Sequence, residues 1–276
     1  MSDGLEIRIA RRVAVVTLAR EKVRNAFNET LIAELASAFG KLGADDAVRV
    51  VVLAARGPAF CAGADLDWMR RMAGYSVEEN RTDARALADM LRTIYECPKP
   101  TIARVHGDAY AGGMGLVAAC DIAVAASGAN FCLSETKLGL IPATISPYVV
   151  RALGEQAARR YALTAERFDA AEALRLGFVH ATAPADALDA RIEEIVAALL
   201  QTSANAVRET KRLVRSVAGR PVDEALVAET AEAIAAIRTS PDGREGVRAF
   251  LEKRKPRWVA EYEAEIAAAD GDDEEM

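Results

Sequence analysis

Three apolar segments constrain the fold of this chain more than any other feature. Residues 48–55, 101–105 and 121–125 are almost continuously apolar, a pattern typical of strands that are buried on both faces. The chain does not place a long helix at every crossover between them, as a doubly wound sheet normally needs. We therefore predict an α/β fold built from repeated strand-strand-helix turns in one main domain.

The regions around these segments give further elements. Apolar and polar residues alternate over residues 5–9 and 13–17 and are interrupted by Arg11 and Arg12, which predicts an antiparallel hairpin. Asn28 stands before an apolar pattern with helical spacing, so we expect it to cap a helix that ends near Gly43. A long amphipathic helix is predicted over residues 76–97, ended by Pro98.

The last third of the chain is predicted to be almost wholly helical from Pro184 onward. We therefore divide the chain into a catalytic core over residues 1–183, a helical packing or oligomerisation region over 184–258, and an acidic tail over 259–276. The tail lacks apolar periodicity, so we expect it to be mobile and without a catalytic role.

Composition narrows the possible functions. The formal net charge is -6, so the molecule as a whole repels nucleic acids and anionic membranes, and an anionic ligand needs a local basic cluster. Neither a signal peptide nor an apolar run of about 20 residues is recognisable, which favours a cytoplasmic location. The chain has two histidines, both expected to be structural, and four cysteines expected to be buried free thiols: His106, His180, Cys61, Cys97, Cys120 and Cys132.

Two glycine-containing loops follow predicted strands. FCAGADLDWM (60–69) contains Gly63, which permits a tight turn, and AYAGGMGL (109–116) contains Gly112 and Gly113 before a short apolar helix. Each loop alone is explained by a simple change of chain direction. Together they could provide two backbone N–H donors for the oxygen of a thioester, as the stabilisation of an enolate requires.

A carboxyl group lies in a third segment, SETKLGLIP (134–142). Glu135 precedes an apolar turn, and partial burial there would raise its pKa toward the working pH. The alternative is a glutamate that caps a helix, but Ser134 and Lys137 do not form a capping box. Glu135 is therefore the candidate proton carrier.

These three segments resemble the crotonase (enoyl-CoA hydratase/isomerase) superfamily, in the right order and within a match from about Leu5 to Trp258. The resemblance implies that the N–H groups of Ala64 and Gly112 hold the thioester oxygen, and that Glu135 is catalytic. It also implies a crotonase-like spiral of strand-strand-helix turns and a C-terminal trimerisation region, with trimers often paired as hexamers. The residues that it implies for substrate and CoA binding are Lys22, Arg24, Ala62, Asp65, Leu66, Gly113, Phe250 and Lys253.

One departure from the family pattern concerns its first catalytic glutamate, whose position falls at Gly115. Glu135 then either moves a proton between two substrate carbons, as in isomerases, or serves both the hydroxyl group and the alpha carbon with the help of water. The missing side chain is also expected to leave room for a bulkier or branched acyl group.

The run FCLSETKLGLIPATISPYVVRALGEQAARRYALTAERFDAAEA (131–173) is most similar to the bacterial hydratases of leucine and acyclic isoprenoid catabolism, which act on methylglutaconyl-CoA and carboxygeranoyl-CoA. IPATISPYV stands where many relatives have a glycine-rich IPGGGG run. The resemblance therefore implies a branched enoyl-CoA substrate, with CoA as part of the substrate and neither a metal nor a separate cofactor.

Two other functions remain open from the sequence. Double-bond isomerisation is the nearest alternative, because position 115 lacks a glutamate. RNA binding is an alternative of another class, since Arg81, Arg85 and Arg92 could form a basic stripe on the helix predicted over 76–97. Asp83 and Asp89 interrupt that stripe, however, and the overall acidity argues against it.

Overall fold

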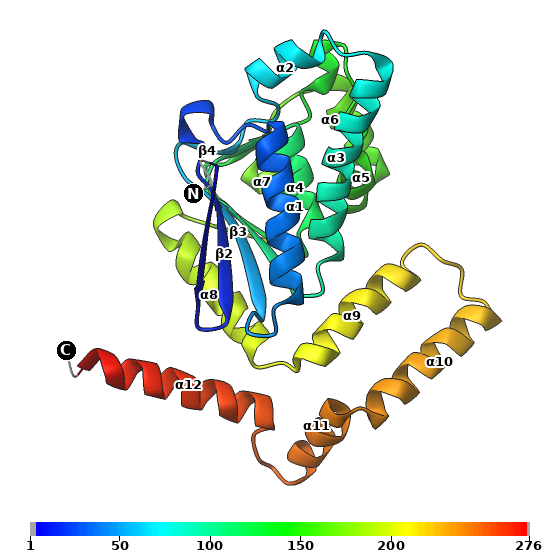
Figure 1. The fold of residues 1–276 in the computed structure, drawn as a ribbon. Helices are drawn as coiled ribbons and strands as arrows, with labels where there is room; N and C mark the ends of the chain where they lie inside the picture. Colours follow the sequence, from blue (N-terminus) through cyan, green and yellow to red (C-terminus); the bar gives the residue numbers. More distant parts are fainter. Residues whose placement is uncertain (1–3, 275–276) are drawn as a thin grey trace. The chain divides into compact units, whose positions relative to one another are not determined.

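The structure is a computed structural model that describes residues 4–274 (Figure 1). The chain forms two compact units, of which the first comprises Met1–Cys97 and Thr101–Glu194, and the second comprises Pro98–Pro100 and Ile195–Met276. The main unit thus extends to Glu194, beyond the boundary expected at residue 183. Each unit is described by itself.

A six-stranded sheet forms the centre of the first unit. Its strands have the order β1-β2-β3-β5-β7-β10, with β1 antiparallel to β2 and the others parallel. The predicted hairpin is confirmed, and its turn places Arg11 and Arg12 in the left-handed region at φ 47° and 64°. Every residue of β3 is buried, as its apolar run predicts. The bounds are β1 Leu5–Ala10, β2 Val13–Leu18, β3 Val50–Ala55, β5 Thr101–Val105, β7 Ile122–Ala126 and β10 Ala181–Ala183.

A second, four-stranded sheet consists of short strands in the order β4-β6-β8-β9. Its first three strands are parallel, and β9 is antiparallel to β8. The chain passes from β3 to β4, from β5 to β6 and from β7 to β8, so each turn contributes one strand to each sheet before a helix follows. This arrangement confirms the predicted strand-strand-helix spiral. The bounds are β4 Ala59–Cys61, β6 Asp108–Tyr110, β8 Asn130–Cys132 and β9 Phe168–Asp169.

The two longest helices of the first unit begin where the sequence predicts. Asn28 caps α1 (Glu29–Ala44) by accepting a hydrogen bond from Leu31 N–H, and Ser76 forms a capping box with Glu79 at the start of α3 (Val77–Glu96). Helices α1 and α3 pack side by side (Figure 1). The remaining helices are η1 Glu21–Val23, α2 Leu66–Met72, α4 Gly112–Ala119, η2 Glu135–Leu138, α5 Ser146–Leu153, α6 Glu155–Thr164, α7 Ala170–Arg175 and η3 Ala185–Ala187.

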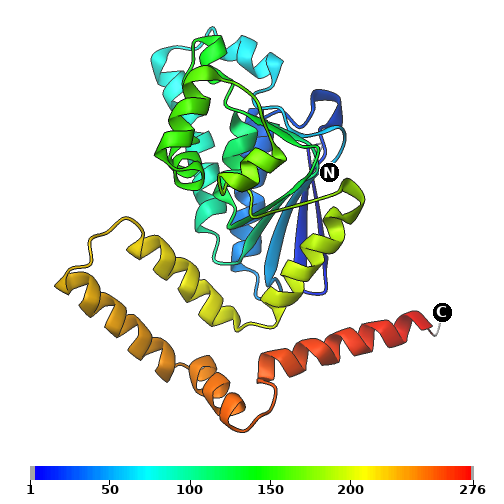
Figure 2. The same ribbon diagram turned by 180° about the vertical axis from the view of Figure 1, so that it is seen from behind.

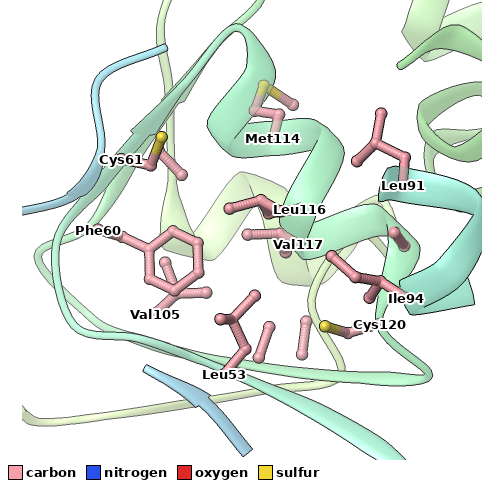
Figure 3. Packing of buried hydrophobic residues seen from close by; sticks show 14 of the residues in the cluster. Leu53, Phe60, Cys61, Leu91, Ile94, Val105, Met114, Leu116, Val117 and Cys120 are labelled. Carbon is pink, nitrogen blue, oxygen red and sulfur yellow. The ribbon is translucent and has the colours of Figure 1, made fainter. Parts of the chain in front are cut away.

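The core of the first unit surrounds α4. Figure 3 shows Leu91 and Ile94 of α3 beside α4, near Leu116 and Val117. All four side chains are at most 1% exposed. The short helix that follows the second glycine loop is therefore fixed by apolar packing on several sides, which keeps its first turn in a defined position.

The second unit is helical, as predicted. Helix α8 (Leu188–Leu200) begins in the first unit and ends in the second. Figure 2 shows the helices after it running one after another, with α9 and α10 in opposite directions. Helix α12 covers the region expected to be an acidic tail as far as residue 274, residues 275–276 lie outside the described part, and the mobility of the tail stays a prediction. The bounds are α9 Ala204–Val217, α10 Glu224–Thr239, α11 Pro241–Leu251 and α12 Arg257–Glu274.

Candidate active site

Three parallel strands of the small sheet end at the same edge. Strand β4 ends at Cys61, β6 at Tyr110 and β8 at Cys132, and the register pairs Tyr110 directly with Cys132. The three predicted catalytic positions, Ala64, Gly112 and Glu135, each follow one of these ends within three residues. The small sheet therefore brings together at one edge three segments that are far apart in the sequence.

The two glycine loops are in contact with one another. A Cβ atom added at Gly63, whose φ is +94°, would lie 3.1 Å from the Cβ of Ala111. A Cβ atom added at Gly113 would lie only 2.5 Å from the carbonyl oxygen of Cys61, closer than real Cβ contacts allow. Glycine is required at position 113 by this close approach and at position 63 by its positive φ.

The N–H groups of Ala64 and Gly112 are available as donors. Phe27 N–H donates to Gly63 O at 2.7 Å and Asp65 N–H donates to Phe27 O at 2.8 Å, so Ala64 between them directs its N–H to the opposite side. Gly112 is the first residue of α4, where N–H groups have no partner within the helix. Within residues 4–274, neither N–H has a hydrogen-bond acceptor.

Glu135 is the first residue of η2, and its carboxyl group is partly desolvated. Its Oε2 atom is buried and has no hydrogen-bond partner among the described residues. Burial raises the pKa of this carboxyl group above its ordinary value, and a hydrogen bond from its own backbone N–H opposes the shift only in part. The desolvation expected from the apolar turn is confirmed, and the group is suited to exchange protons with a ligand.

The carboxylate of Asp65 is fully engaged within the protein. Its Oδ1 accepts from Asp67 N–H at 2.8 Å and Trp68 N–H at 3.2 Å, and its Oδ2 pairs with Arg20 at 2.9 Å. Burial opposes ionisation, yet these hydrogen bonds outweigh it and hold the pKa below its ordinary value. No local pattern indicates this ion pair, because Arg20 and Asp65 are far apart in the chain. The pair makes Asp65 a support of the first loop, and the contact of Asp65 with substrate stays a prediction.

Residues 22–28 (KVRNAFN), which contain Lys22 and Arg24, lie beside the first loop, where Ala62 N–H donates to Arg24 O at 3.0 Å. Asn25 is fully buried and fixes the segment by donating to the carbonyl oxygens of Arg56 and Ala59, each at 2.8 Å. Lys22 and Arg24 are exposed on its surface. Two basic side chains thus lie beside the candidate site, where an anionic ligand would need them.

The other predicted binding residues have less defined places. Leu66 follows the first loop and is 69% exposed, and Phe250 in α11 is 82% exposed. Lys253 follows α11 with φ 54°. Phe250 and Lys253 belong to the second unit, and their contact with CoA stays a prediction.

The expectation of free space at Gly115 is wrong. A Cβ atom added there would lie 2.3 Å from Cγ2 of Ile145, 2.9 Å from its Cβ and 3.6 Å from Cδ2 of Leu91. The volume that a side chain at position 115 would need is therefore already filled. The sequence could not show this, because Ile145 is distant in the chain.

The histidines and cysteines have structural surroundings. Nε2 of His106 lies 2.8 Å from Gly57 O, and Nδ1 of His180 accepts from Ala123 N–H at 3.0 Å. The four cysteines are free and buried. The prediction of buried free thiols is confirmed, and the structural role of the two histidines stays a prediction.

The proposed basic stripe on α3 is neutralised by acidic neighbours. Arg81 pairs with Glu78, and Arg85 and Arg92 both pair with Asp89, at 2.7 and 3.1 Å. The arrangement is that of a solvated helix face.

Among the helices of residues 4–274, none combines the length and the apolar character that a membrane span requires.

Residues 8–261 match the family model described as enoyl-CoA hydratase/isomerase. The chain belongs to this family. It is 34% identical over 248 residues to the mevalonyl-coenzyme A hydratase of Aspergillus fumigatus, covering 89% of this chain and 91% of the relative. Among solved structures it is similar to an enoyl-CoA hydratase from Shewanella pealeana, with 43% identity, a TM-score of 0.91 and coverage of 94% and 97%. It is also similar to one from Mycobacterium smegmatis, with 39% identity, a TM-score of 0.87 and coverage of 92% and 98%.

The family membership agrees with the crotonase fold predicted from the three segments. It also agrees with an enzyme that acts on CoA thioesters, the chemistry for which the relatives are named.

Proposed function

We propose that this protein is an enoyl-CoA hydratase that adds water reversibly to the double bond of an enoyl-CoA thioester. The observation that carries the proposal is the edge of the small sheet, where two unpaired N–H groups and one partly desolvated carboxyl group follow three neighbouring strand ends. These are the groups that the reaction needs: donors for a developing oxyanion and a carrier for a proton.

The mechanism begins with the thioester oxygen between the N–H groups of Ala64 and Gly112. Ionised Glu135 removes a proton from a water molecule, whose oxygen bonds to the beta carbon while negative charge collects on the thioester oxygen. Protonated Glu135 then returns its proton to the alpha carbon, and the enolate collapses to the hydroxyacyl thioester. The loss of one oxyanion donor typically costs about 3 kcal/mol of barrier.

Lys22 and Arg24 are the residues of this chain that we assign to the phosphates of CoA. Both are exposed beside the first loop, whose backbone is joined to Arg24. The net charge of -6 makes such a local basic cluster necessary for an anionic ligand. CoA is part of the substrate, and the proposed steps use neither a metal nor a redox cofactor.

For the acyl group we propose a branched enoyl-CoA such as methylglutaconyl-CoA. The proposal is supported by the resemblance of residues 131–173 to hydratases of branched substrates and by a relative named for mevalonyl-CoA, whose acyl group is branched. Space at Gly115 does not support it, because Ile145 fills that position. The branch would therefore lie elsewhere along the acyl pocket.

The test is to incubate the purified full chain with a panel of straight and branched enoyl-CoA esters in water enriched in heavy oxygen. Hydration places the label in the hydroxyacyl product, and we expect incorporation with at least one ester. Double-bond isomerisation is the second candidate, favoured by glycine at position 115, and it moves the double bond without incorporation. Turnover without label would replace hydration by isomerisation.

We propose that the second unit mediates assembly into a trimer or a pair of trimers. Helix α9 has no buried residue, and apolar side chains of the second unit are exposed: Leu213, Val214, Val227, Ile234, Val247, Phe250 and Leu251. Apolar surfaces of this kind mark interaction sites. Light scattering of the full chain in solution tests the state of assembly.

A further inference from the structure

Ile145 leaves no room for a side chain at position 115. An added Cβ at Gly115 would lie 2.3 Å from Cγ2 of Ile145 and 2.9 Å from its Cβ, while real Cβ atoms essentially never come within 3.0 Å of another heavy atom. The glycine and the isoleucine are thus complementary in size, because the space holds one side chain but not both.

Ile145 cannot easily move aside. Its carbonyl oxygen accepts hydrogen bonds from Tyr148 at 3.1 Å and Val149 at 3.0 Å, which fix its backbone at the start of α5. Its side chain is 2% exposed and β-branched, so its rotamer is restricted by packing. On the other side of position 115, Leu91 lies 3.6 Å from the added atom.

Position 115 lies on α4 one helical turn from the proposed oxyanion donor. Gly115 follows Gly112 by three residues in the same helix, and residues with this spacing are neighbours on a helix surface. Ile145 ends the segment that begins at Glu135 and leads to α5. Ile145 therefore belongs to the segment of the proton carrier and packs against the helix of one oxyanion donor.

We propose that Ile145 determines the acyl-group specificity of the site, by filling with its methyl groups the space that a side chain at position 115 would need. The proposal rests on the proposed hydratase function. It assigns the width of the pocket beside α4 to Ile145 and explains why position 115 carries no carboxylate. A site walled by methyl groups accepts apolar acyl carbons there and holds no water on that side.

The first test measures the size complementarity without turnover. Gly115→Glu is expected to lower the thermal midpoint of the full chain by on the order of 5–10 °C through overpacking. Ile145→Gly, which removes both the Cβ and the Cγ2 atom, is combined with it in a double variant. We expect the thermal midpoint of the double variant to fall by less than the sum of the decreases in the two single variants. Gly128→Glu is the control, because nothing lies within 4 Å of an added Cβ there.

The second test measures specificity. Ile145→Ala widens the pocket, so we expect the ratio of kcat/KM for 3-methylcrotonyl-CoA over crotonyl-CoA to rise about tenfold, the usual effect of a methylene group in a pocket. Ile94→Ala is the matched control, since Ile94 is equally buried and lies on α3. The ratio of dissociation constants for isovaleryl-CoA and butyryl-CoA is measured on the same variants and reads the pocket without chemistry.

The two failures are distinguishable. Esters that bind but are never hydrated contradict the proposed function, while the ratio of dissociation constants and the thermal midpoints of the single and double variants still report on Ile145. If the decreases in midpoint of Gly115→Glu and Ile145→Gly simply add in the double variant, the size complementarity is overturned. An equal change of ratio in the Ile145 and Ile94 variants overturns the role of Ile145 in specificity.

Discussion

Two loops at the edge of the small sheet carry a carboxyl group each, yet the protein treats them in opposite ways. Asp65 in the first loop accepts three hydrogen bonds, including one from Arg20, and its pKa is lowered. Glu135 in the third loop has a buried oxygen without a partner, and its pKa is raised. A carboxyl group whose oxygens all accept hydrogen bonds, as in Asp65, supports the fold. A carboxyl group with an unpartnered oxygen, as in Glu135, is available for proton transfer.

Of all the variants considered, Glu135→Gln should produce the largest effect, and that effect should fall on the rate of hydration alone. The amide keeps the shape of the side chain but cannot carry the proton, so kcat for hydration should fall about 10³-fold, within the range typical of a lost general base. Steady-state kinetics measure the loss, and binding of a saturated acyl-CoA should be retained. The exposed Glu78→Gln is the matched control. Full activity of Glu135→Gln would remove the proton carrier from the mechanism.

The same comparison predicts a pH dependence. Hydration requires ionised Glu135, so kcat/KM should fall as the pH decreases through a pKa above the ordinary 4.5. A folded pKa above the unfolded value means that ionisation destabilises the fold, so stability due to Glu135 is present below 4.5 and is lost as the pH rises through the folded pKa. At neutral pH, Glu135→Gln should be at least as stable as the unaltered protein.

Gly112→Ala should have the next largest effect, because it disturbs a donor rather than a carboxyl group. The added Cβ would lie 2.5 Å from Cε2 of Phe27, so the start of α4 must shift and its N–H must move. We expect kcat to fall about 10²-fold, as when an oxyanion donor is lost. Gly128→Ala is the control, with open space around its Cβ. Unchanged kcat in Gly112→Ala would contradict the role of this N–H group.

Much of this site could be predicted because its glycines and its glutamate follow strand ends that are visible in the sequence. The hairpin and the cap residues Asn28 and Ser76 were predictable for the same reason, since local patterns determine them. The small sheet was not, because strands of three residues such as β4 are too short to show a period. The Arg20 partner of Asp65 and the contact of Ile145 with Gly115 depend on residues far apart in the chain, which no local pattern reveals.

Asp65→Ala should affect stability more than rate. It leaves Arg20 half-buried without its carboxylate and removes the cap of α2, so the free energy of unfolding should fall by about 3 kcal/mol, typical of a broken buried pair. Denaturant unfolding measures the loss, and Asp67→Ala, at an exposed neighbour paired with Arg70, is the control. The lowered pKa means that this stabilisation is present above the unfolded pKa and is lost as the pH falls through the folded one.

Arg85→Ala should have the smallest effect, because its partner Asp89 is exposed on α3 and also pairs with Arg92. Exposed ion pairs of this spacing contribute about 0.3–0.5 kcal/mol, so the free energy of unfolding should change far less than in Asp65→Ala. The variant should also leave unchanged any retention of RNA by the protein at low salt, because acidic partners already neutralise the three arginines. Salt-dependent retention of RNA that Arg85→Ala abolishes would reverse this conclusion and show that α3 presents its charges to a polyanion.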